Sequence, residues 1–98
     1  MRYGAVPPTW FLYVIQCSDA SLYVGITTDL PRRIAEHNAG KGGFYTRGRR
    51  PVTLRYREFH ASRSAAARRE AEIKRWPRAG KLALIVKWGV RRQGRPRQ

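Results

Sequence analysis

The chain has 98 residues, 42% of them hydrophobic and 11% aromatic, and its 21 lysines and arginines against six acids give a formal charge of +15. A chain of this length buries only about 60 to 65% of the surface that its unfolded form exposes, which excludes a second independent core, and its apolar content excludes wholesale disorder. So large an excess of positive charge, most of it from arginine, predicts a polyanionic partner, of which nucleic acid is the commonest.

The first part of the chain predicts a hairpin. Residues 1–9 contain two prolines and are expected to form an irregular N-terminal segment. Trp10–Gln16 is a short apolar run, rich in aromatic and β-branched residues, which predicts a strand buried on both faces. Residues 17–21 suit a turn, and Leu22–Thr27 predicts a second strand that pairs with the first.

The middle of the chain predicts a helix, a loop and a third strand. Asp29 can cap a helix that ends at Gly40. Lys41–Arg50 contains three glycines, four basic residues and no acid, and is expected to be a loop. Residues 52–59 alternate apolar and polar side chains, which predicts a half-exposed strand. Its buried face is expected to carry Val52, Leu54 and Tyr56.

The last part of the chain predicts two helices and a tail. Ser62 or Ser64 can cap a helix that runs to Trp76 and is followed by a proline. Lys81–Lys87 predicts a final helix that packs on the sheet, with a strand as the alternative. Residues 88–98 contain four arginines and no acid, and are expected to form a flexible basic tail.

This order of elements predicts the fold class. A hairpin followed by separated helices and a strand indicates one small α/β domain over residues 10–87. Its sheet is expected to have three strands, mainly antiparallel, with helices flanking it. Cys17 is the single cysteine, which excludes an internal disulfide, and its apolar neighbours indicate that it packs rather than reacts.

The sequence offers no signal for a membrane or for secretion. It contains no run of about 18 apolar residues, so no membrane-spanning helix is expected. The first residues lack the charged, apolar and small-residue order of a secretory signal. We therefore expect a cytoplasmic protein, associated with the nucleoid if it is bacterial, with no membrane contact.

Two tyrosines, Tyr13 and Tyr23, lie ten residues apart on the two strands of the predicted hairpin. A loop with an odd number of residues and a register centred on Ser18 would place them opposite each other on one face, whereas an even loop would place them on opposite faces. Both alternatives stay open. Gly25 would share the face of Tyr23 and would leave room for another group to approach the backbone.

Arg33 and His37 lie four residues apart on the first predicted helix and therefore share one face. This pairing places a phosphate-binding guanidinium beside a titratable imidazole. A solvated helix with a structural histidine is the alternative. Arg32 points about 100° away, toward solvent or a distant phosphate.

The second predicted helix carries two acids, Glu70 and Glu72, among many basic residues. Each is either an ion-pair partner or a ligand of a hard metal ion, and the periodicity of the helix does not choose between them. Mg²⁺ takes only one or two protein carboxylates and completes its shell with water and substrate phosphate, so one glutamate is sufficient.

These elements together resemble the GIY-YIG nuclease domain. Residues 11–13 (FLY) match its first signature triplet loosely, and residues 23–25 (YVG) match the second closely. The segment YVGITTDLPRRIAEHNAGKGG is similar to the small single-domain bacterial members of the YhbQ type. The relatives of that type include the Slx-type structure-selective nucleases and the N-terminal nuclease domain of UvrC.

The resemblance also matches individual residues of this chain to functional positions of the family. Arg33 and His37 fall at the family's arginine and at its histidine-or-tyrosine position. The segment SAAARREAEIK resembles the family's metal-binding helix, and the resemblance selects Glu70 over Glu72. Many larger members place an asparagine after this helix, where the present sequence reads LIVKWG.

The resemblance implies an endonuclease that hydrolyses phosphodiester bonds with Mg²⁺ or Mn²⁺. DNA is expected more than RNA, in branched, single-stranded or damaged form, in repair or recombination. Glu70 is the implied metal ligand. The implied catalytic residues are Tyr13, Tyr23, Arg33, His37 and Glu70. The alternative is a nucleic-acid-binding module of the same fold without turnover.

The basic loop at residues 41–50 is expected to contact the nucleic-acid backbone, and Phe44 or Tyr45 to stack on an unpaired base. A simple surface loop is the alternative. The residues expected to contact nucleic acid are Arg32, Lys41, Tyr45, Arg47, Arg49, Arg50 and Lys74. Small domains of this kind often act with a protein partner or as a homodimer.

Overall fold

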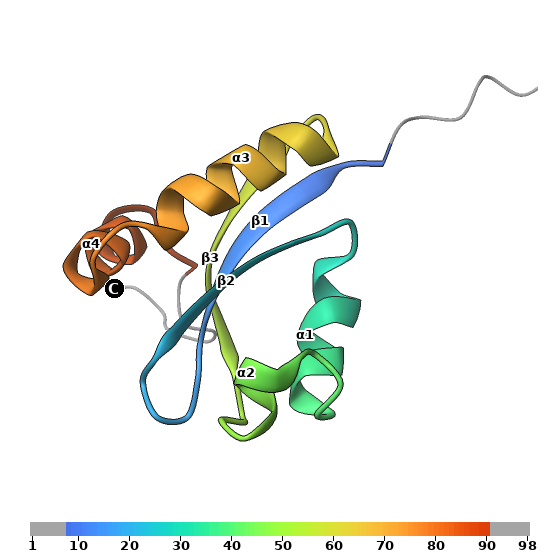
Figure 1. Ribbon diagram of the computed structural model, residues 1–98, viewed down its shortest axis with the longest axis vertical. Helices are drawn as coiled ribbons and strands as arrows, with labels where there is room; N and C mark the ends of the chain where they lie inside the picture. Colours follow the sequence, from blue (N-terminus) through green and yellow to red (C-terminus); the bar gives the residue numbers. More distant parts are fainter. Residues whose placement is uncertain (1–7, 91–98) are drawn as a thin grey trace, which may run out of the picture.

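The structure, a computed structural model, describes residues 8–90, and within them three strands and four helices (Figure 1). In chain order these elements are β1 (Trp10–Gln16), β2 (Leu22–Thr27), α1 (Leu30–Asn38), α2 (Phe44–Arg47), β3 (Thr53–His60), α3 (Arg63–Lys74) and α4 (Arg78–Trp88). The irregular segment predicted for residues 1–9 and the tail predicted for residues 88–98 lie mostly outside the described residues, so those assignments stay predictions. None of the helices in residues 8–90 has the length and apolarity of a membrane span.

The sheet has the strand order β2-β1-β3, and both pairings are antiparallel. This arrangement confirms the predicted three-stranded sheet flanked by helices. β1 takes the central place because its sequence is apolar on both faces. Its four middle residues, Leu12, Tyr13, Val14 and Ile15, are each 1% exposed or less.

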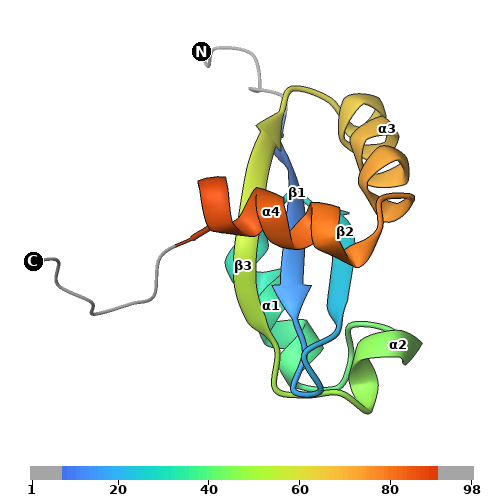
Figure 2. The same ribbon diagram turned by 90° about the vertical axis from the view of Figure 1, so that its left-hand side faces the viewer.

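Helices cover both faces of this sheet. Figure 2 shows α4 crossing one face, α3 on the side of β2, and α1 behind the sheet. Leu12 and Val14 pack on the first face against Ile73 of α3 and Ile85 of α4. The other face carries a second buried cluster, made by Tyr13, Ile15, Cys17, Leu30 and Val52. The burial of Cys17 in that cluster fits the packing role that its neighbours predict.

A β-bulge corrects the prediction for the third strand. Tyr56 pairs with Val14, but Leu54 pairs with the next residue of β1, Ile15, so Arg55 is an extra residue in β3. An extra residue turns the side chains that follow it to the opposite face. Leu54 and Tyr56 therefore join different core clusters, although strict alternation predicted one common face.

The helix boundaries follow from their caps. The Asp29 carboxylate accepts a hydrogen bond from the backbone N–H of Arg32 at 3.1 Å, which confirms the predicted cap of α1. Ser62, not Ser64, caps α3 by accepting from the N–H of Ala65. The final helix begins earlier than predicted because Pro77 stands at its N-cap, where a missing N–H costs nothing.

The segment predicted as a plain loop contains one helical turn, α2. Gly43 at its N-cap provides no side-chain hydrogen bond. The turn is held instead by its contacts with α1 and β2: Thr46 is fully buried beside His37, and Tyr45 stacks on Tyr23. Local sequence gives little sign of such a helix, because isolated helices this short are not stable without tertiary contacts.

Candidate active site

The hairpin register decides how the two tyrosines lie. The loop at residues 17–21 has an odd number of residues, so Tyr13 and Tyr23 share one face of the sheet. They are not directly opposite, because Tyr13 pairs with Gly25 and Tyr23 pairs with Ile15. The register is centred on Asp19 and not on Ser18, which makes the two tyrosines diagonal neighbours.

Gly25 is required by the Tyr13 ring. A Cβ atom added at Gly25 would overlap the hydroxyl end of Tyr13, which lies directly over the glycine. The expectation that Gly25 lets another group approach the backbone is therefore confirmed, and the group is the phenol of Tyr13 itself.

The Tyr13 hydroxyl is the point where the first helix meets the sheet. It lies 2.9 Å from Nε2 of His37, and Nε of Arg33 donates to it at 3.4 Å. Arg33 and His37 come from successive turns of α1, as their spacing of four predicts. His37 is fully buried, so the three side chains form one packed group and not a solvated helix face.

The other nitrogen of His37 has a partner that the sequence reasoning missed. His37 Nδ1 lies 2.8 Å from Oγ1 of Thr46, which is fully buried on α2. Two glycines at 42 and 43 are the signal that could have indicated this contact, because a Cβ at Gly42 would overlap the His37 ring. Such glycines mark a close approach between two parts of a chain.

The donors and acceptors among Tyr13, Arg33 and His37 indicate where the protons lie. Arg33 can only donate, so the Tyr13 oxygen accepts from it. The proton of a neutral Tyr13 phenol then points to His37 Nε2, and the Nδ1–H of His37 donates to Thr46. A threonine hydroxyl both donates and accepts, so it can serve either tautomer of the histidine.

Both titratable groups are held neutral near pH 7. Burial and the nearby positive charge of Arg33 lower the pKa of His37. Burial raises the pKa of the Tyr13 phenol, and the hydrogen bond and charge of Arg33 offset only part of that rise. The cation beside Tyr13 therefore does not make it a phenolate in the free protein.

Arg33 is oriented by three different groups. Besides its contact with Tyr13, its Nη1 donates to the Glu36 carboxylate and its Nη2 to the carbonyl oxygen of Gly42, both at 3.0 Å. The side chain is nevertheless 30% exposed. A guanidinium has five N–H donors, so donors on both Nη atoms stay available for a phosphate.

Tyr23 lies in a stack that leads outward from this group. Its ring is edge-on to His37, with centroids 5.4 Å apart, and stacks on Tyr45 of α2 at 5.8 Å. The guanidinium of Arg49 lies 4.0 Å from the Tyr45 centroid and is held by Asp19 at 3.1 Å. Tyr23 is only half-buried, whereas Tyr13 is 1% exposed, so of these two tyrosines Tyr23 is the one that solvent can reach.

Glu70 reaches the same edge of the sheet from α3. Its Oε2 lies 3.1 Å from Nζ of Lys74, and that Nζ lies 5.9 Å from the centroid of the Tyr23 ring. The charge of Glu70 also contributes to the raised pKa of Tyr13, after burial as the largest cause. Lys74 thus links the Glu70 carboxylate to the ring of Tyr23.

Glu72 belongs to a different group of side chains. It pairs with Arg69 at 3.1 Å, and Arg69 in turn donates to Glu58 of β3 at 2.7 Å. The Glu72 side chain is 51% exposed, against 23% for Glu70. The geometry therefore separates the two acids that helical periodicity leaves equivalent.

The donor set around Glu70 suits a hard metal ion. Residues 8–90 contain no group of three or more histidine, cysteine, aspartate or glutamate side chains that could enclose a metal. One accessible carboxylate fits Mg²⁺ or Mn²⁺, which take the rest of their shell from water and phosphate. It does not fit zinc, whose sites need three or four protein ligands.

The other predicted nucleic-acid contacts are spread around this edge. Arg32 is 69% exposed between Asp29 and Glu36, 3.9 Å from each carboxylate. Lys41 and Arg47 are exposed on either side of the short helix α2. The role of these residues in binding nucleic acid stays a prediction.

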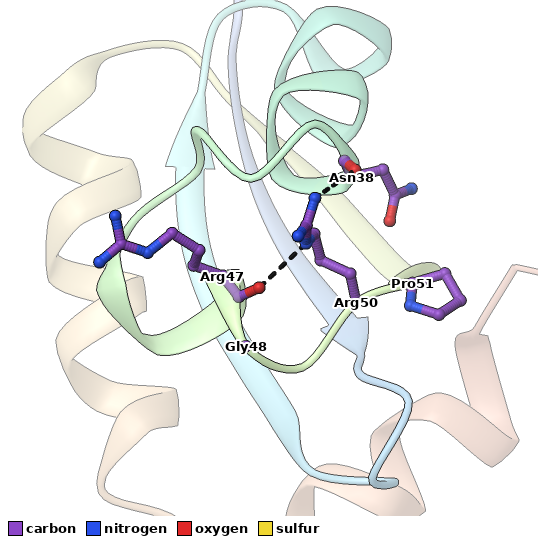
Figure 3. Close-up of a pocket in the computed structure, with 5 residues that line it drawn as sticks. All are labelled: Asn38, Arg47, Gly48, Arg50 and Pro51. Carbon is purple, nitrogen blue, oxygen red and sulfur yellow. Dashed lines mark hydrogen bonds between the residues drawn. The ribbon is translucent and has the colours of Figure 1, made fainter.

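Arg50 lines a surface depression between the end of α1 and the segment after α2 (Figure 3). Its guanidinium donates to the carbonyl oxygens of Arg47 at 2.9 Å and Asn38 at 3.4 Å. Figure 3 also shows the Arg47 side chain pointing away from Arg50. Arg50 therefore braces the backbone here, while Arg47 extends outward.

Comparison with known proteins gives a family match over most of the chain. Residues 9–83 match the family model described as the GIY-YIG catalytic domain. A UPF0213 protein of Halobacterium salinarum is 60% identical over 74 residues, which are 76% of this chain and 96% of that protein. A UPF0213 protein of Staphylococcus haemolyticus is 53% identical over 75 residues, 76% of this chain and 92% of that protein.

Solved structures agree with these matches. The solution structure of a UPF0213 protein from Bacillus halodurans has a TM-score of 0.53 at 40% identity, over 81% of this chain and 84% of that one. A solution structure of a protein from E. faecalis has a TM-score of 0.56 at 37% identity, with the same coverage. The names of these relatives state no activity.

Proposed function

The chain belongs to the GIY-YIG family, in its small single-domain UPF0213 branch, and from this premise we propose that it is a metal-dependent nuclease that hydrolyses phosphodiester bonds in DNA. One observation carries the proposal. Arg33 and His37 converge on the phenol oxygen of Tyr13, and the ion pair of Glu70 with Lys74 lies beside the Tyr23 ring.

Arg33 would bind the scissile phosphate. Its position is fixed by Tyr13, Glu36 and the Gly42 carbonyl, and donors on both Nη atoms stay free. A guanidinium that is already oriented needs no reorganisation when negative charge grows on the phosphate oxygens. Tyr13 and His37 would act through Arg33 and Tyr23, as positioning residues.

Tyr23 would orient the attacking water, and in its phenolate form it would accept the proton of that water and become a neutral phenol. Two observations favour it over Tyr13: its ring is half-buried, and Tyr13 is covered, with its oxygen engaged by His37 and Arg33. The ammonium of Lys74 lies 5.9 Å from the centroid of the Tyr23 ring. The products would carry 5′-phosphate and 3′-hydroxyl ends.

Glu70 would hold the metal ion, Mg²⁺ or Mn²⁺. When bound, such an ion stabilises negative charge on a non-bridging phosphate oxygen and on the leaving 3′ oxygen. Lys74 forms the ion pair with Glu70 in the free protein, and its ammonium would then be free to contact a phosphate of the same strand.

The proposed substrates are branched, single-stranded or damaged DNA, handled in repair or recombination in the cytoplasm or at the nucleoid. The test is a cleavage panel of single strands, duplexes, flaps and four-way junctions, each with Mg²⁺ and with Mn²⁺. We expect metal-dependent nicking of at least one substrate, abolished by a chelator. Absence of nicking on every substrate with both metals would contradict the proposal.

The second candidate function is a nucleic-acid-binding module without turnover. It is favoured by one observation, the engagement of Glu70 by Lys74 at 3.1 Å, which leaves the carboxylate neutralised within the protein. This candidate predicts binding that weakens steeply with salt and no cleavage in the same panel. Reproducible metal-dependent cleavage would exclude it.

A further inference from the structure

The short helix α2 is fixed to the candidate active site by three contacts. Thr46 bonds to His37 at 2.8 Å, and Tyr45 stacks on Tyr23 at 5.8 Å. Just before the helix, the carbonyl oxygen of Gly42 accepts from Arg33 at 3.0 Å. A group exposed on α2 is therefore held at a constant position relative to Arg33 and Tyr23.

Phe44 is such a group. Its side chain is 86% exposed at the start of α2, so it contributes almost nothing to the core. The guanidinium of Arg47, one helical turn later, lies 5.6 Å from the ring centroid. An aromatic ring beside a cation, in a segment with four basic residues and no acid, combines the two features by which proteins hold unpaired nucleotides.

Tyr45, the other aromatic residue of α2, is already occupied. Tyr23 stacks on it, and Arg49 lies 4.0 Å from its centroid. Only 38% of Tyr45 is exposed, so a base could reach it only by displacing one of these neighbours. The structure thus distinguishes two aromatic residues that the sequence left equivalent.

We propose that Phe44 and Arg47 form a binding site for one unpaired nucleobase of the DNA strand that enters the active site. The base would stack on the Phe44 ring. Arg47 would contact the phosphate of that nucleotide or the free face of the base. A base inside a duplex is covered by its neighbours on both faces, so this site selects DNA with a single-stranded segment or an extruded base. The inference rests on the proposed nuclease function and names its substrate class.

The test measures binding by the full chain in EDTA, where no metal-dependent cleavage occurs. The ligands are a short single strand carrying 2-aminopurine and a duplex of the same sequence. Stacking of one base is lost in Phe44→Ala, so single-strand affinity should fall about 5- to 150-fold while duplex affinity stays within about twofold. The fluorescence quenching of 2-aminopurine on binding should be lost in parallel.

Two variants act as controls. Phe59→Ala removes another largely exposed phenylalanine, 62% exposed on β3 at the opposite edge of the sheet, and should leave both affinities unchanged. Phe44→Trp keeps a stacking ring and should restore single-strand binding and quenching. Unchanged single-strand affinity in Phe44→Ala, or an equal loss on both ligands, would overturn the base site.

The binding test of the base site and the cleavage test of the nuclease proposal can fail separately. If Phe44→Ala loses single-strand binding but the wild-type chain cleaves nothing, the base site stands and the nuclease proposal fails. If cleavage occurs and Phe44→Ala binds both ligands like the wild type, the nuclease proposal stands and the base site fails.

Discussion

Thr46 is the residue whose position adds most to what the sequence suggests. Its hydroxyl fixes the ring of His37, which lies against the rings of Tyr13 and Tyr23. A buried histidine nitrogen without a partner is costly, so the hydroxyl stabilises the orientation of the ring.

We expect Thr46→Val, which keeps the shape of the side chain and removes the hydroxyl, to lower stability by about 1 to 3 kcal/mol. Because the His37 ring loses its orientation, nicking should also slow by about tenfold, as for other residues that orient an active-site group. Thr46→Ser should restore the nicking rate, measured under conditions where each variant is fully folded. Normal nicking by Thr46→Val would mean that the hydroxyl is only structural.

The lowered pKa of His37 predicts how stability changes with pH. In the unfolded chain the imidazole binds a proton below about pH 6.5, whereas in the folded protein its pKa is lower because of burial and Arg33. Between these two values the unfolded state holds more protons, so the free energy of unfolding decreases as the pH falls below about 6.5.

Thermal unfolding followed by circular dichroism between pH 7.5 and 5 measures this effect. The melting temperature of the wild type should fall across that interval. In His37→Gln, which has no imidazole at this position, the fall should be smaller. The same fall in both proteins would contradict the assignment of the effect to His37.

At the scale of elements, α3 must be held in one rotation for Glu70 to reach the sheet edge. Glu58 of β3 provides this restraint, because it accepts hydrogen bonds from Arg69 of α3, from Tyr56 and from His60. Burial alone would raise the pKa of Glu58, but these hydrogen bonds outweigh it and lower the pKa below its usual value.

Glu58→Gln should therefore destabilise the fold by about 1 to 3 kcal/mol, since it weakens several hydrogen bonds to a largely buried charge. Chemical denaturation measures this change, with Glu72→Gln as the control on the exposed end of the same group of side chains. A Glu58 variant as stable as the Glu72 variant would show that β3 does not restrain α3.

The elements also show what sequence patterns could and could not predict. The apolar run of β1 and the caps of α1 and α3 are local signals, and they predicted those elements correctly. The bulge at Arg55 and the one-turn helix α2 depend on contacts with distant residues, so local alternation and composition misjudged both. The hairpin register was open for the same reason.

At the scale of the molecule, the candidate site draws on four elements: Tyr13 from β1, Tyr23 from β2, Arg33 and His37 from α1, and Glu70 from α3. The family resemblance named these residues. The fold joins the first four through the Tyr13 hydroxyl and the His37 ring, and it links Glu70 to Tyr23 through Lys74. No sequence pattern indicates that Thr46 bonds to His37 or that Phe44 is exposed, because both features depend on how α2 packs. The charge of +15 indicated the kind of partner but not where the chemistry would occur.

Nicking of a DNA flap in Mg²⁺ by Glu70→Gln, compared with Glu72→Gln from the same helix, tests the central claim most directly. Both variants remove one negative charge from α3, so they change the net charge equally. If Glu70 holds the metal ion, its variant should nick at least about 100-fold more slowly than the wild type while it binds the flap equally well, and the Glu72 variant should keep full activity. Full nicking activity in Glu70→Gln would contradict the account.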